Sequence, residues 1–540
     1  MKCLPAEIEQ GNVEYKLQLL NPSADRFQHL VTQLNWRLNE GHGYAYYELG
    51  VADDGLVIGM PPEDLEKSLN TLFRMCQVLS AKMHVQSFRE GSQPSYKAAR
   101  VAVSRIAETH AKKQVRVSVI GDVDSGKSTL IGVLTRGCLD DGNGLARMQV
   151  FRHLHEIENG RTSSISEQIM GVTKDGKICK FSTLESRNTS SIDAQSTKLI
   201  MLSDLAGHQR YLKITASGLT SQFPDYAMLV VDAKSGVQSM TREHLQIVLG
   251  LEISVFVVVT KVDMVDAPRI SQTLQEISAL LASMDVAKTP CYITDASQLE
   301  TYNSLQDTNV VPIFQVSNVS GANMPLLQQF LASIDPTRSW PSVRNCTSEF
   351  HISGHFQSED VGTIVTGLVK SGTVHVGESL LLGPTNSGSF YGVHVKSIEV
   401  QRTPAKSIFA GQTAALLVTS LDNDEIDMTT LRRGMMLVHP SLSPMATRQF
   451  DAEVQLLNAS VVLKENTQGV IHAGPIQQVA KVVAILDEKS HTVRLRFEFV
   501  HSPEYMRPDW PLVFRERHTH AVGKVLQAVY LKPDLVRSVA

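Results

Sequence analysis

Apolar runs alternate with helix-like segments through the middle of the chain. Four runs have the length and apolar content of buried strands: 115–120, 199–203, 253–259 and 311–316. Three segments carry apolar residues at the three- and four-residue spacing of helices: 241–251, 269–284 and 324–334. Strands that alternate with helices are typical of a parallel sheet with crossover helices. We therefore interpret residues 113–338 as one α/β domain.

The pattern changes after this domain. From 349 to 437, and again from 450 to 525, short alternating strands are separated by glycine-containing turns, as in Lys370-Ser-Gly372 and Arg432-Arg-Gly434. Such spacing favours closed or nearly closed barrels. We expect two β-barrel domains, at 345–442 and 446–540.

The first 95 residues form a separate pattern. A strand-like run near Val13 precedes a helix face that includes Phe27, and Asp53-Asp-Gly55 lies between two further apolar runs as a hairpin signal. A second helical pattern and a strand near Val85 follow. The order βαββαβ predicts a small α+β domain of the ferredoxin-like type at 1–95, joined by a basic, helix-like linker at 96–112.

A glycine-rich loop follows the first strand of the α/β domain. Residues 121–128 fit the pattern G-x-x-x-x-G-K-[ST], between a strand and a helix. In this pattern backbone N–H groups cradle phosphates, the lysine reaches the β- and γ-phosphates, and the hydroxyl holds Mg²⁺. The expected phosphate-binding residues are Gly121, Asp122, Val123, Asp124, Ser125, Gly126, Lys127, Ser128 and Thr129.

Three further motifs each follow an apolar run, in the order that a guanine-nucleotide site requires. Asp204 and Gly207 form a D-x-x-G that can bind Mg²⁺ through water and sense the γ-phosphate. Thr260, Lys261 and Asp263 follow the next run. The Asp263 carboxylate can accept hydrogen bonds from the N1–H and 2-amino groups of guanine, which adenine does not have. The last motif supplies backbone amides for the guanine O6: Ser317, Asn318 and Val319. Ligands bind beyond the carboxyl ends of parallel strands, where all these motifs fall.

These motifs resemble those of the translational, elongation-factor-like GTPases. The run Phe151-Arg-His-Leu-His-Glu-Ile-Glu-Asn-Gly-Arg-Thr-Ser-Ser164 resembles more specifically the family of GTP-binding proteins 1 and 2. The resemblance covers nearly the whole chain, and two N-terminal runs, 11–17 and 27–33, look more like the second of these proteins than the first. It implies a three-domain core of one GTPase domain and two barrels, although family members usually have Gly where Arg517 stands.

The resemblance also implies roles for individual residues. Thr162 would be the first-switch threonine, which joins Ser128 and Asp204 at Mg²⁺ in the triphosphate state. His208 would orient the attacking water, and with Lys127 and Thr162 would form the catalytic set. Asp124 would help to hold a monovalent cation near the phosphates.

Two positions depart from the superfamily pattern. Thr260 replaces the usual asparagine, and a threonine cannot form both hydrogen bonds by which the asparagine amide ties the base loop to the phosphate loop. We expect lower nucleotide affinity, with specificity retained through Asp263. Ser163 stands where translational factors usually carry isoleucine, so the gating of His208 is expected to differ.

Composition limits the remaining choices. The net charge of −4 and a pI of about 6.5 argue against bulk electrostatic binding of nucleic acid, and we expect no DNA partner. The six cysteines lack paired spacing, and neither a signal peptide nor a long apolar stretch is visible, so a cytoplasmic protein without a membrane role is expected. One set of basic side chains is either a local RNA contact or a solvated barrel face: Arg494, Arg496, Arg507, Arg515, Arg517, His518, His520 and Lys524.

The sequence as a whole predicts a Mg²⁺-dependent GTPase that converts GTP to GDP and phosphate. The family resemblance implies a factor that acts on ribosomes, with a tRNA or a rescue factor resembling Pelota as a partner, in quality control of stalled translation or in messenger surveillance. Two alternatives stay open: a GTP-dependent binding scaffold with little turnover, and a metabolic GTPase like the regulatory subunit of sulfate adenylyltransferase.

Overall fold

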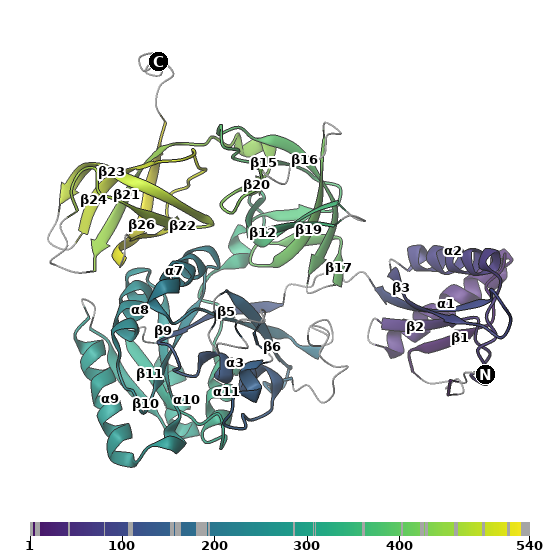
Figure 1. Cartoon of the computed structure of the whole chain (residues 1–540), viewed down its shortest axis with the longest axis horizontal. Helices are drawn as coiled ribbons and strands as arrows, with labels where there is room; N and C mark the ends of the chain where they lie inside the picture. Colours follow the sequence, from purple (N-terminus) through teal and green to yellow (C-terminus); the bar gives the residue numbers. More distant parts are fainter. Residues whose placement is uncertain are drawn as a thin grey trace. The chain divides into compact units, whose positions relative to one another are not determined.

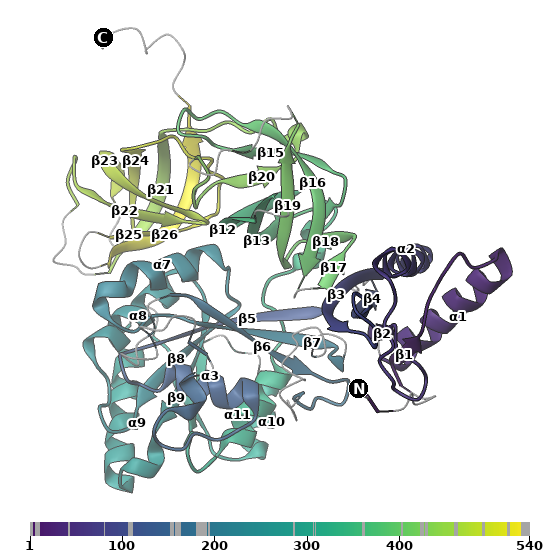
Figure 2. The same cartoon turned by 45° about the vertical axis from the view of Figure 1, so that its right-hand side comes forward.

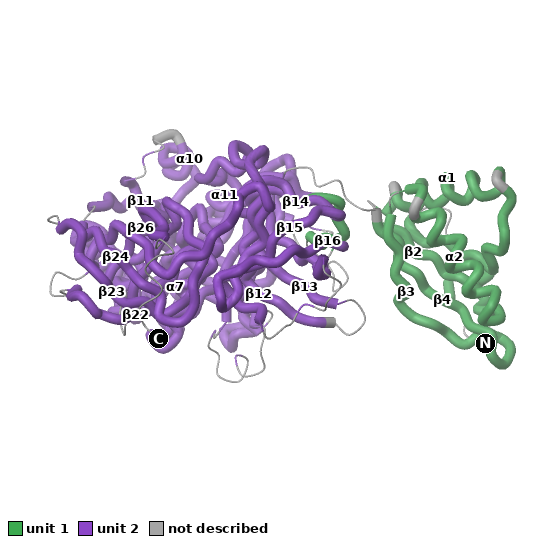
Figure 3. The backbone as a smooth tube through the Cα atoms, turned by 90° about the horizontal axis from the view of Figure 1, so that it is seen from above, with its two compact units in different colours: residues 1–109, 397–407 green, residues 110–396, 408–540 purple. Residues whose placement is uncertain are grey.

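The structure is a computed structural model of the chain. It describes residues 4–5, 11–41, 44–79, 81–105, 112–148, 150–151, 156, 162, 164–179, 192, 195–284, 287–305, 307, 309–358, 362–400, 403–421, 426, 430–457, 463–488, 492–515 and 519–530. Figure 1 draws the whole chain, and its contacts divide it into two compact units (Figure 3). One unit comprises residues 1–109 and 397–407, and the other comprises 110–396 and 408–540.

The N-terminal unit is an α+β domain, as expected. Its elements are β1 (Val13–Lys16), α1 (Ala24–Glu40), β2 (Tyr44–Leu49), α2 (Pro62–Val78), β3 (Ala81–Glu90) and β4 (Lys97–Arg105). The sheet has the order β1-β2-β4-β3, in which β1 runs parallel to β2 and the other neighbours are antiparallel. Both helices pack apolar side chains such as Leu34 and Leu72 into one core with the sheet.

The ferredoxin-like order βαββαβ is wrong for this domain, because its elements follow the order βαβαββ. The second strand of the expected hairpin is absent among the described residues, where Val57 and Met60 form only isolated bridges. The expected basic linker helix is also wrong over its first part. Residues 97–105 form β4, in which Val101 and Val103 are buried in the core while Arg100, Ala102 and Ser104, on the other face, are only partly buried. This period of two identifies a strand.

The α/β domain has a seven-stranded sheet in the order β10-β11-β9-β8-β5-β7-β6. Its strands are β5 (Lys113–Gly121), β6 (Ser166–Val172), β7 (Lys198–Asp204), β8 (Tyr226–Asp232), β9 (Ser254–Thr260), β10 (Thr289–Ile293) and β11 (Val310–Gln315). All neighbours are parallel except the pair β6 and β7. The four expected strands and the parallel sheet are confirmed.

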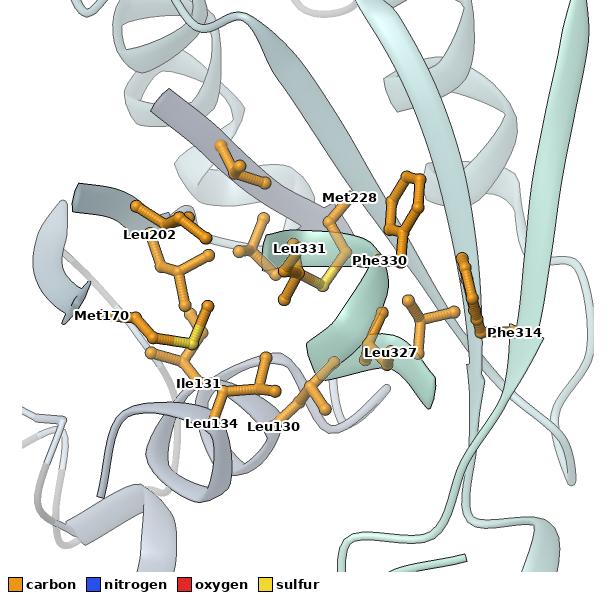
Figure 4. Close-up of a cluster of buried hydrophobic side chains, with 14 of the residues drawn as sticks. Leu130, Ile131, Leu134, Met170, Leu202, Met228, Phe314, Leu327, Phe330 and Leu331 are labelled. Atoms are coloured by element: carbon orange, nitrogen blue, oxygen red, sulfur yellow. The ribbon is translucent and has the colours of Figure 1, made fainter. Parts of the chain in front are cut away.

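Helices cover both faces of this sheet (Figure 2). They are α3 (Lys127–Arg136), α4 (Leu145–Met148), α7 (Leu212–Ser221), α8 (Ser239–Gly250), α9 (Ala267–Ala282), α10 (Ala296–Leu305) and α11 (Met324–Ser333). Figure 4 shows the core on one face, where Leu130 and Leu134 of α3 and Phe330 of α11 pack against strand residues such as Met228. The other core contains side chains of α7, α8 and α9. The two cores hold the strand ends, and hence the loops that follow them, in fixed positions.

Both predicted barrels are present. The first contains β12 (Glu349–Ser358), β13 (Gly362–Ser371), β15 (Ser379–Gly383), β16 (Tyr391–Val400), β19 (Thr413–Ser420) and β20 (Met436–Val438), which close through the pairing of β15 with β16. Strand β17 (Thr403–Ala405) extends it, and β14 (Thr373–His375) pairs with β18 (Ser407–Phe409). The second is a closed barrel of β21 (Gln449–Leu456), β22 (Gln468–Ala473), β23 (Ile476–Glu488), β24 (Thr492–Phe499), β25 (Pro511–Arg515) and β26 (Thr519–Val529).

Helix α7 of the α/β domain, together with Phe223 that follows it, contacts both barrels. It lies against β22 and β25 of the second barrel (Figure 2). Just beyond its end, the buried ring of Phe223 lies 4.0 Å from the Lys370 ammonium of the first barrel. The ring of His351 on the first barrel lies 5.7 Å from Phe223 and 5.0 Å from Trp510 of the second. The end of α7 is thus packed against residues of both barrels.

Candidate nucleotide site

The phosphate loop (residues 121–128) joins β5 to α3. Gly121 and Gly126 have φ values of 146° and 88°, and Asp124 has a left-handed φ of 58°. Nζ of Lys127 donates hydrogen bonds to the carbonyl oxygens of Gly121 at 3.1 Å and Asp122 at 2.6 Å. Burial lowers the pKa of the Lys127 ammonium below its usual value, and the nearby carboxylate of Asp204 opposes that shift. The loop therefore curls around a buried cation, as a phosphate cradle requires.

The three predicted Mg²⁺ residues lie together beside this loop. Ser128 Oγ donates to Asp204 Oδ2 at 2.6 Å, Thr162 Oγ1 donates to the same oxygen at 3.0 Å, and the two hydroxyls are 2.9 Å apart. Asp204 is fully buried, and no described residue forms a hydrogen bond with its Oδ1. Burial raises the pKa of the Asp204 carboxyl, against the effect of the Ser128 hydrogen bond and the Lys127 charge. Two hydroxyls and an unsatisfied buried carboxylate oxygen are hard ligands that fit Mg²⁺.

The glycine that ends the D-x-x-G motif packs against the phosphate loop. Gly207 fits directly against it, since a Cβ built there would lie 2.4 Å from Lys127 Nζ and 2.7 Å from the Asp122 carbonyl oxygen. His208 precedes the short 3-10 helix η2 (Gln209–Tyr211), and its Nδ1 accepts the Arg210 N–H at 3.0 Å. In a neutral ring the proton then lies on Nε2. His208 is half-buried and lines the same cavity as Lys127.

The base-binding loops are joined to the phosphate loop by side chains. Lys261, with a left-handed φ of 58°, donates from Nζ to the Asp124 carbonyl at 2.6 Å and to Asp232 Oδ2 at 3.0 Å. Asp263 lies exposed in the 3-10 helix η3 (Val262–Met264). Its carboxylate has no partner among the residues that the structure describes, which leaves it open to a ligand.

The loop 317–319 is also preorganised. The hydroxyl of buried Ser317 accepts hydrogen bonds from the N–H groups of Val319 at 3.2 Å and Ser320 at 3.0 Å. Val316 at its start is bound to β9 through the Val259 carbonyl. The loop therefore stands at the carboxyl end of β11, beside the loop that follows β9.

The structure explains how the chain accommodates Thr260. Its hydroxyl donates to the Ser125 carbonyl at 2.7 Å, so one link between the base loop and the phosphate loop is retained. The side chain of Asn318 reaches the same place, because a Cβ built at Gly126 would lie 3.5 Å from Thr260 Oγ1 and 3.6 Å from Asn318 Nδ2. Asn318 is buried, and its Oδ1 has no partner. An asparagine amide thus lies beside the phosphate loop here too, supplied by the neighbouring loop instead of the strand end.

This arrangement predicts a reciprocal effect in nucleotide binding. N318A is expected to weaken GDP binding up to about tenfold, because it removes a buried polar group at the phosphate loop. T260N alone is expected to weaken binding by overpacking against Asn318, and T260N/N318A to recover most of the affinity. Titration with a fluorescent GDP measures all three variants. V319A, which changes an exposed side chain of the same loop, is the control. Additive losses in the double variant would contradict the exchange.

The cavity between these loops has a volume of about 290 Å³. The predicted residues in its lining come from the phosphate loop, the first-switch threonine, the D-x-x-G segment with the histidine that follows it, and the base loop. They are Val123, Asp124, Gly126, Lys127, Ser128, Thr129, Thr162, Gly207, His208 and Lys261. It also includes Arg147 of α4, which the motifs did not identify. Ser163 lies outside the described residues.

A second residue that the motifs missed is His244 on α8. Its Nδ1 accepts the Gly121 N–H at 3.2 Å from behind the phosphate loop. Burial first, and the charge of Lys127 second, lower the pKa of His244 to about 3. His244 therefore stays neutral and accepts this hydrogen bond throughout the physiological pH range. Its place on the apolar face of a predicted helix was the available sequence signal.

The basic set of the C-terminal barrel is largely neutralised. Arg496 pairs with Asp451 at 2.7 Å, Arg494 with Glu453 at 3.1 Å and Arg507 with Glu349 at 2.6 Å. Arg515 is buried. Residues 516–518 and the side chain of His520 lie outside the description. For the described arginines the ion pairs favour a structural role over an RNA contact.

Comparison with known proteins gives consistent results. Residues 112–337 match the elongation factor Tu GTP binding domain. GTP-binding protein 2 of Mus musculus is 39% identical over 97% of this chain and 88% of its own length, and GTP-binding protein 1 of Xenopus laevis is 37% identical over 95% and 78%. The translation elongation factor SelB from Methanococcus maripaludis, solved with the GTP analogue GppNHp, has a similar fold, with a TM-score of 0.56 and 18% identity over 78% of this chain and 81% of SelB. No helix in the described ranges is both long and apolar enough to cross a membrane.

Proposed function

We infer the activity from a family relationship: this chain belongs to the family of GTP-binding proteins 1 and 2, elongation-factor-like GTPases. Its site binds GTP with Mg²⁺ and hydrolyses it to GDP and phosphate. The observation that supports this most is the cluster of Ser128, Thr162 and Asp204 beside Lys127, in a cavity at the carboxyl ends of the strands. Two hydroxyls and one carboxylate from separate segments form a set of oxygen ligands that suits a hard cation such as Mg²⁺.

Each residue then has a distinct task in phosphoryl transfer. The amides of the phosphate loop and Lys127 bind the phosphates and stabilise the charge that develops on them. Ser128, Thr162 and Asp204 would hold Mg²⁺, which would neutralise phosphate charge when bound. His208 orients the attacking water, and Asp263 selects guanine. No covalent intermediate is required, because positioning and electrostatics carry the reaction.

We place this GTPase in the cytoplasm, on the ribosome, in the rescue or surveillance of stalled translation. The two barrels after the GTPase domain, the contacts of α7 with the second barrel and of Phe223 with the first, and the family membership support this role. Release of Thr162 after hydrolysis would change the packing of the switch segments, and α7 would pass that change to the barrels. A tRNA or a Pelota-like rescue factor is the partner that we propose for this assembly.

Sedimentation with ribosomes tests this function. The full chain is expected to pellet with ribosomes in a non-hydrolysable GTP analogue and to stay in the supernatant in GDP. D263N supplies the matched control. Asparagine can donate a hydrogen bond to the 2-oxo group of xanthine, but it cannot accept hydrogen bonds from both guanine donors. The affinity of this variant for guanine nucleotides is expected to fall at least about a hundredfold. D263N should then pellet with ribosomes in the corresponding non-hydrolysable xanthosine triphosphate analogue and not in the GTP analogue. Pelleting that ignores the nucleotide would contradict the proposed function.

A further inference from the structure

The segment that carries Arg147 is built rigidly onto the nucleotide site. The Asp140 carboxylate accepts N–H groups of Gly142 at 3.1 Å, Gly144 at 3.3 Å and Ala146 at 2.9 Å. The Asp140 N–H donates to the Asn318 carbonyl at 2.9 Å, which ties the segment to the base-binding loop. On the opposite side, the Ala146 carbonyl packs so closely on α3 that a Cβ added to Gly132 would lie 2.3 Å from its oxygen. Helix α4 is thus fixed to two walls of the site.

The Arg147 guanidinium has no protein partner. Within the described ranges no oxygen accepts a hydrogen bond from it and no carboxylate forms an ion pair with it. The guanidinium lies over Gly144, where a Cβ would be 2.4 Å from Nε, and that glycine has a φ of 96°. A glycine is required there for both reasons. The side chain lines the cavity together with Lys127, Thr162 and His208.

Among the described residues, the charged side chains that line the cavity leave Arg147 without an anionic partner. The lining contains three cations, Lys127, Arg147 and Lys261, and one carboxylate, that of Asp124. Both lysines already donate to backbone carbonyls of the phosphate loop. Of these three cations, Arg147 has no partner among the residues that the structure describes, and it lines a space that the phosphate loop shapes for anions. A planar guanidinium binds two phosphate oxygens at once, which an ammonium cannot do.

We propose that Arg147 binds the phosphate chain of the nucleotide directly, as a second side-chain cation supplied by α4 beside Lys127. This assignment rests on the proposed function of the site. The guanidinium adds a charge that the loop motif does not contain, and it comes from the segment that leads into the first switch.

Nucleotide titration of the full chain tests this assignment. R147M is expected to weaken binding of a fluorescent, non-hydrolysable GTP analogue by about tenfold to a hundredfold, the effect of losing a charged hydrogen bond. R147K should recover part of the loss. L145A, on the exposed side of the same helix, should bind like the wild type. Raising the salt concentration should weaken the wild type more than R147M, because the wild type has one more charged contact for salt to screen.

The controls separate this proposal from the GTPase assignment. Thermal unfolding of the ligand-free variants shows whether R147M is folded, and if it is not, R147K and the salt dependence still decide. Parallel titration with GDP identifies the phosphate: a loss for both nucleotides places Arg147 at the α- or β-phosphate, and a loss for GTP alone places it at the γ-phosphate. Wild-type affinity in folded R147M would overturn the Arg147 assignment and leave the GTPase standing. Absence of GTP binding in the wild type would overturn the GTPase itself.

Discussion

Replacing Asp204 by asparagine is expected to abolish the Mg²⁺ dependence of GTP binding. In the wild type, Mg²⁺ should tighten binding of a GTP analogue about a hundredfold or more, the order expected for fully desolvated charge contacts. The carboxylate is fully buried, and no described residue forms a hydrogen bond with its Oδ1 that could replace the cation. Asparagine removes that charge without changing the side-chain volume appreciably. Titrations of both proteins in Mg²⁺ and in EDTA measure the effect.

Without metal, D204N is not expected to lower the free energy of unfolding, although it removes the Mg²⁺-dependent gain in nucleotide affinity. Burial raises the Asp204 pKa above its ordinary value of 3.8, so the native state binds this proton more tightly than the unfolded chain. The free energy of unfolding therefore falls as pH rises from about 4 to the raised pKa, and stays low above it. D204N removes this term. In EDTA near neutral pH we expect D204N to be at least as stable as the wild type.

Denaturant titrations in EDTA across this pH range provide the measurement. D266N is the control, because Asp266 caps α9 on the surface and asparagine caps a helix about equally well. It should keep both the Mg²⁺ effect and the pH dependence of the wild type. A D204N protein that binds GTP more tightly in Mg²⁺ than in EDTA, as the wild type does, would contradict the cation site.

Replacing His208 by alanine is expected to lower GTP turnover about a hundredfold or more while leaving nucleotide affinity unchanged. The imidazole lines the cavity, but its hydrogen bond is to the Arg210 N–H, not to the phosphate loop. Its removal should thus cost the positioning of water, which matters only in the transition state. H208Q is expected to retain part of the rate, because a glutamine amide can also orient water.

Single-turnover cleavage of GTP, together with titration by a non-hydrolysable analogue, separates these effects for H208A and H208Q. Equal loss of affinity and rate would indicate that His208 supports the fold of the switch. An unchanged rate in H208A would favour the alternative of a GTP-dependent scaffold, whose function does not need this histidine.

The chemistry of the site was predictable because each motif is local. A phosphate loop, a D-x-x-G and a base loop each follow an apolar run, and a parallel sheet places the ends of such runs at one edge. Asp204, Thr260 and Ser317 therefore come to one site once the strands are recognised. The barrels were predictable for a similar reason, since glycine turns at regular spacing imply short antiparallel strands.

What the sequence could not show depends on contacts between distant segments. The order of the N-terminal sheet follows from the pairing of β4 with both β2 and β3, and no local pattern states which strands pair. The basic character of 97–105 suggested a helix, although Val101 and Val103 alternate as in a strand. Arg147 belongs to no motif, and the reach of Asn318 to the phosphate loop depends on tertiary packing.

The most direct test is the rate of GTP hydrolysis by the purified full chain with and without ribosomes, in Mg²⁺. We predict a slow rate alone and a strong increase with ribosomes that is lost in H208A. A wild-type rate that ribosomes leave unchanged, or a stimulated rate that H208A retains, would contradict a ribosome-activated GTPase that uses His208.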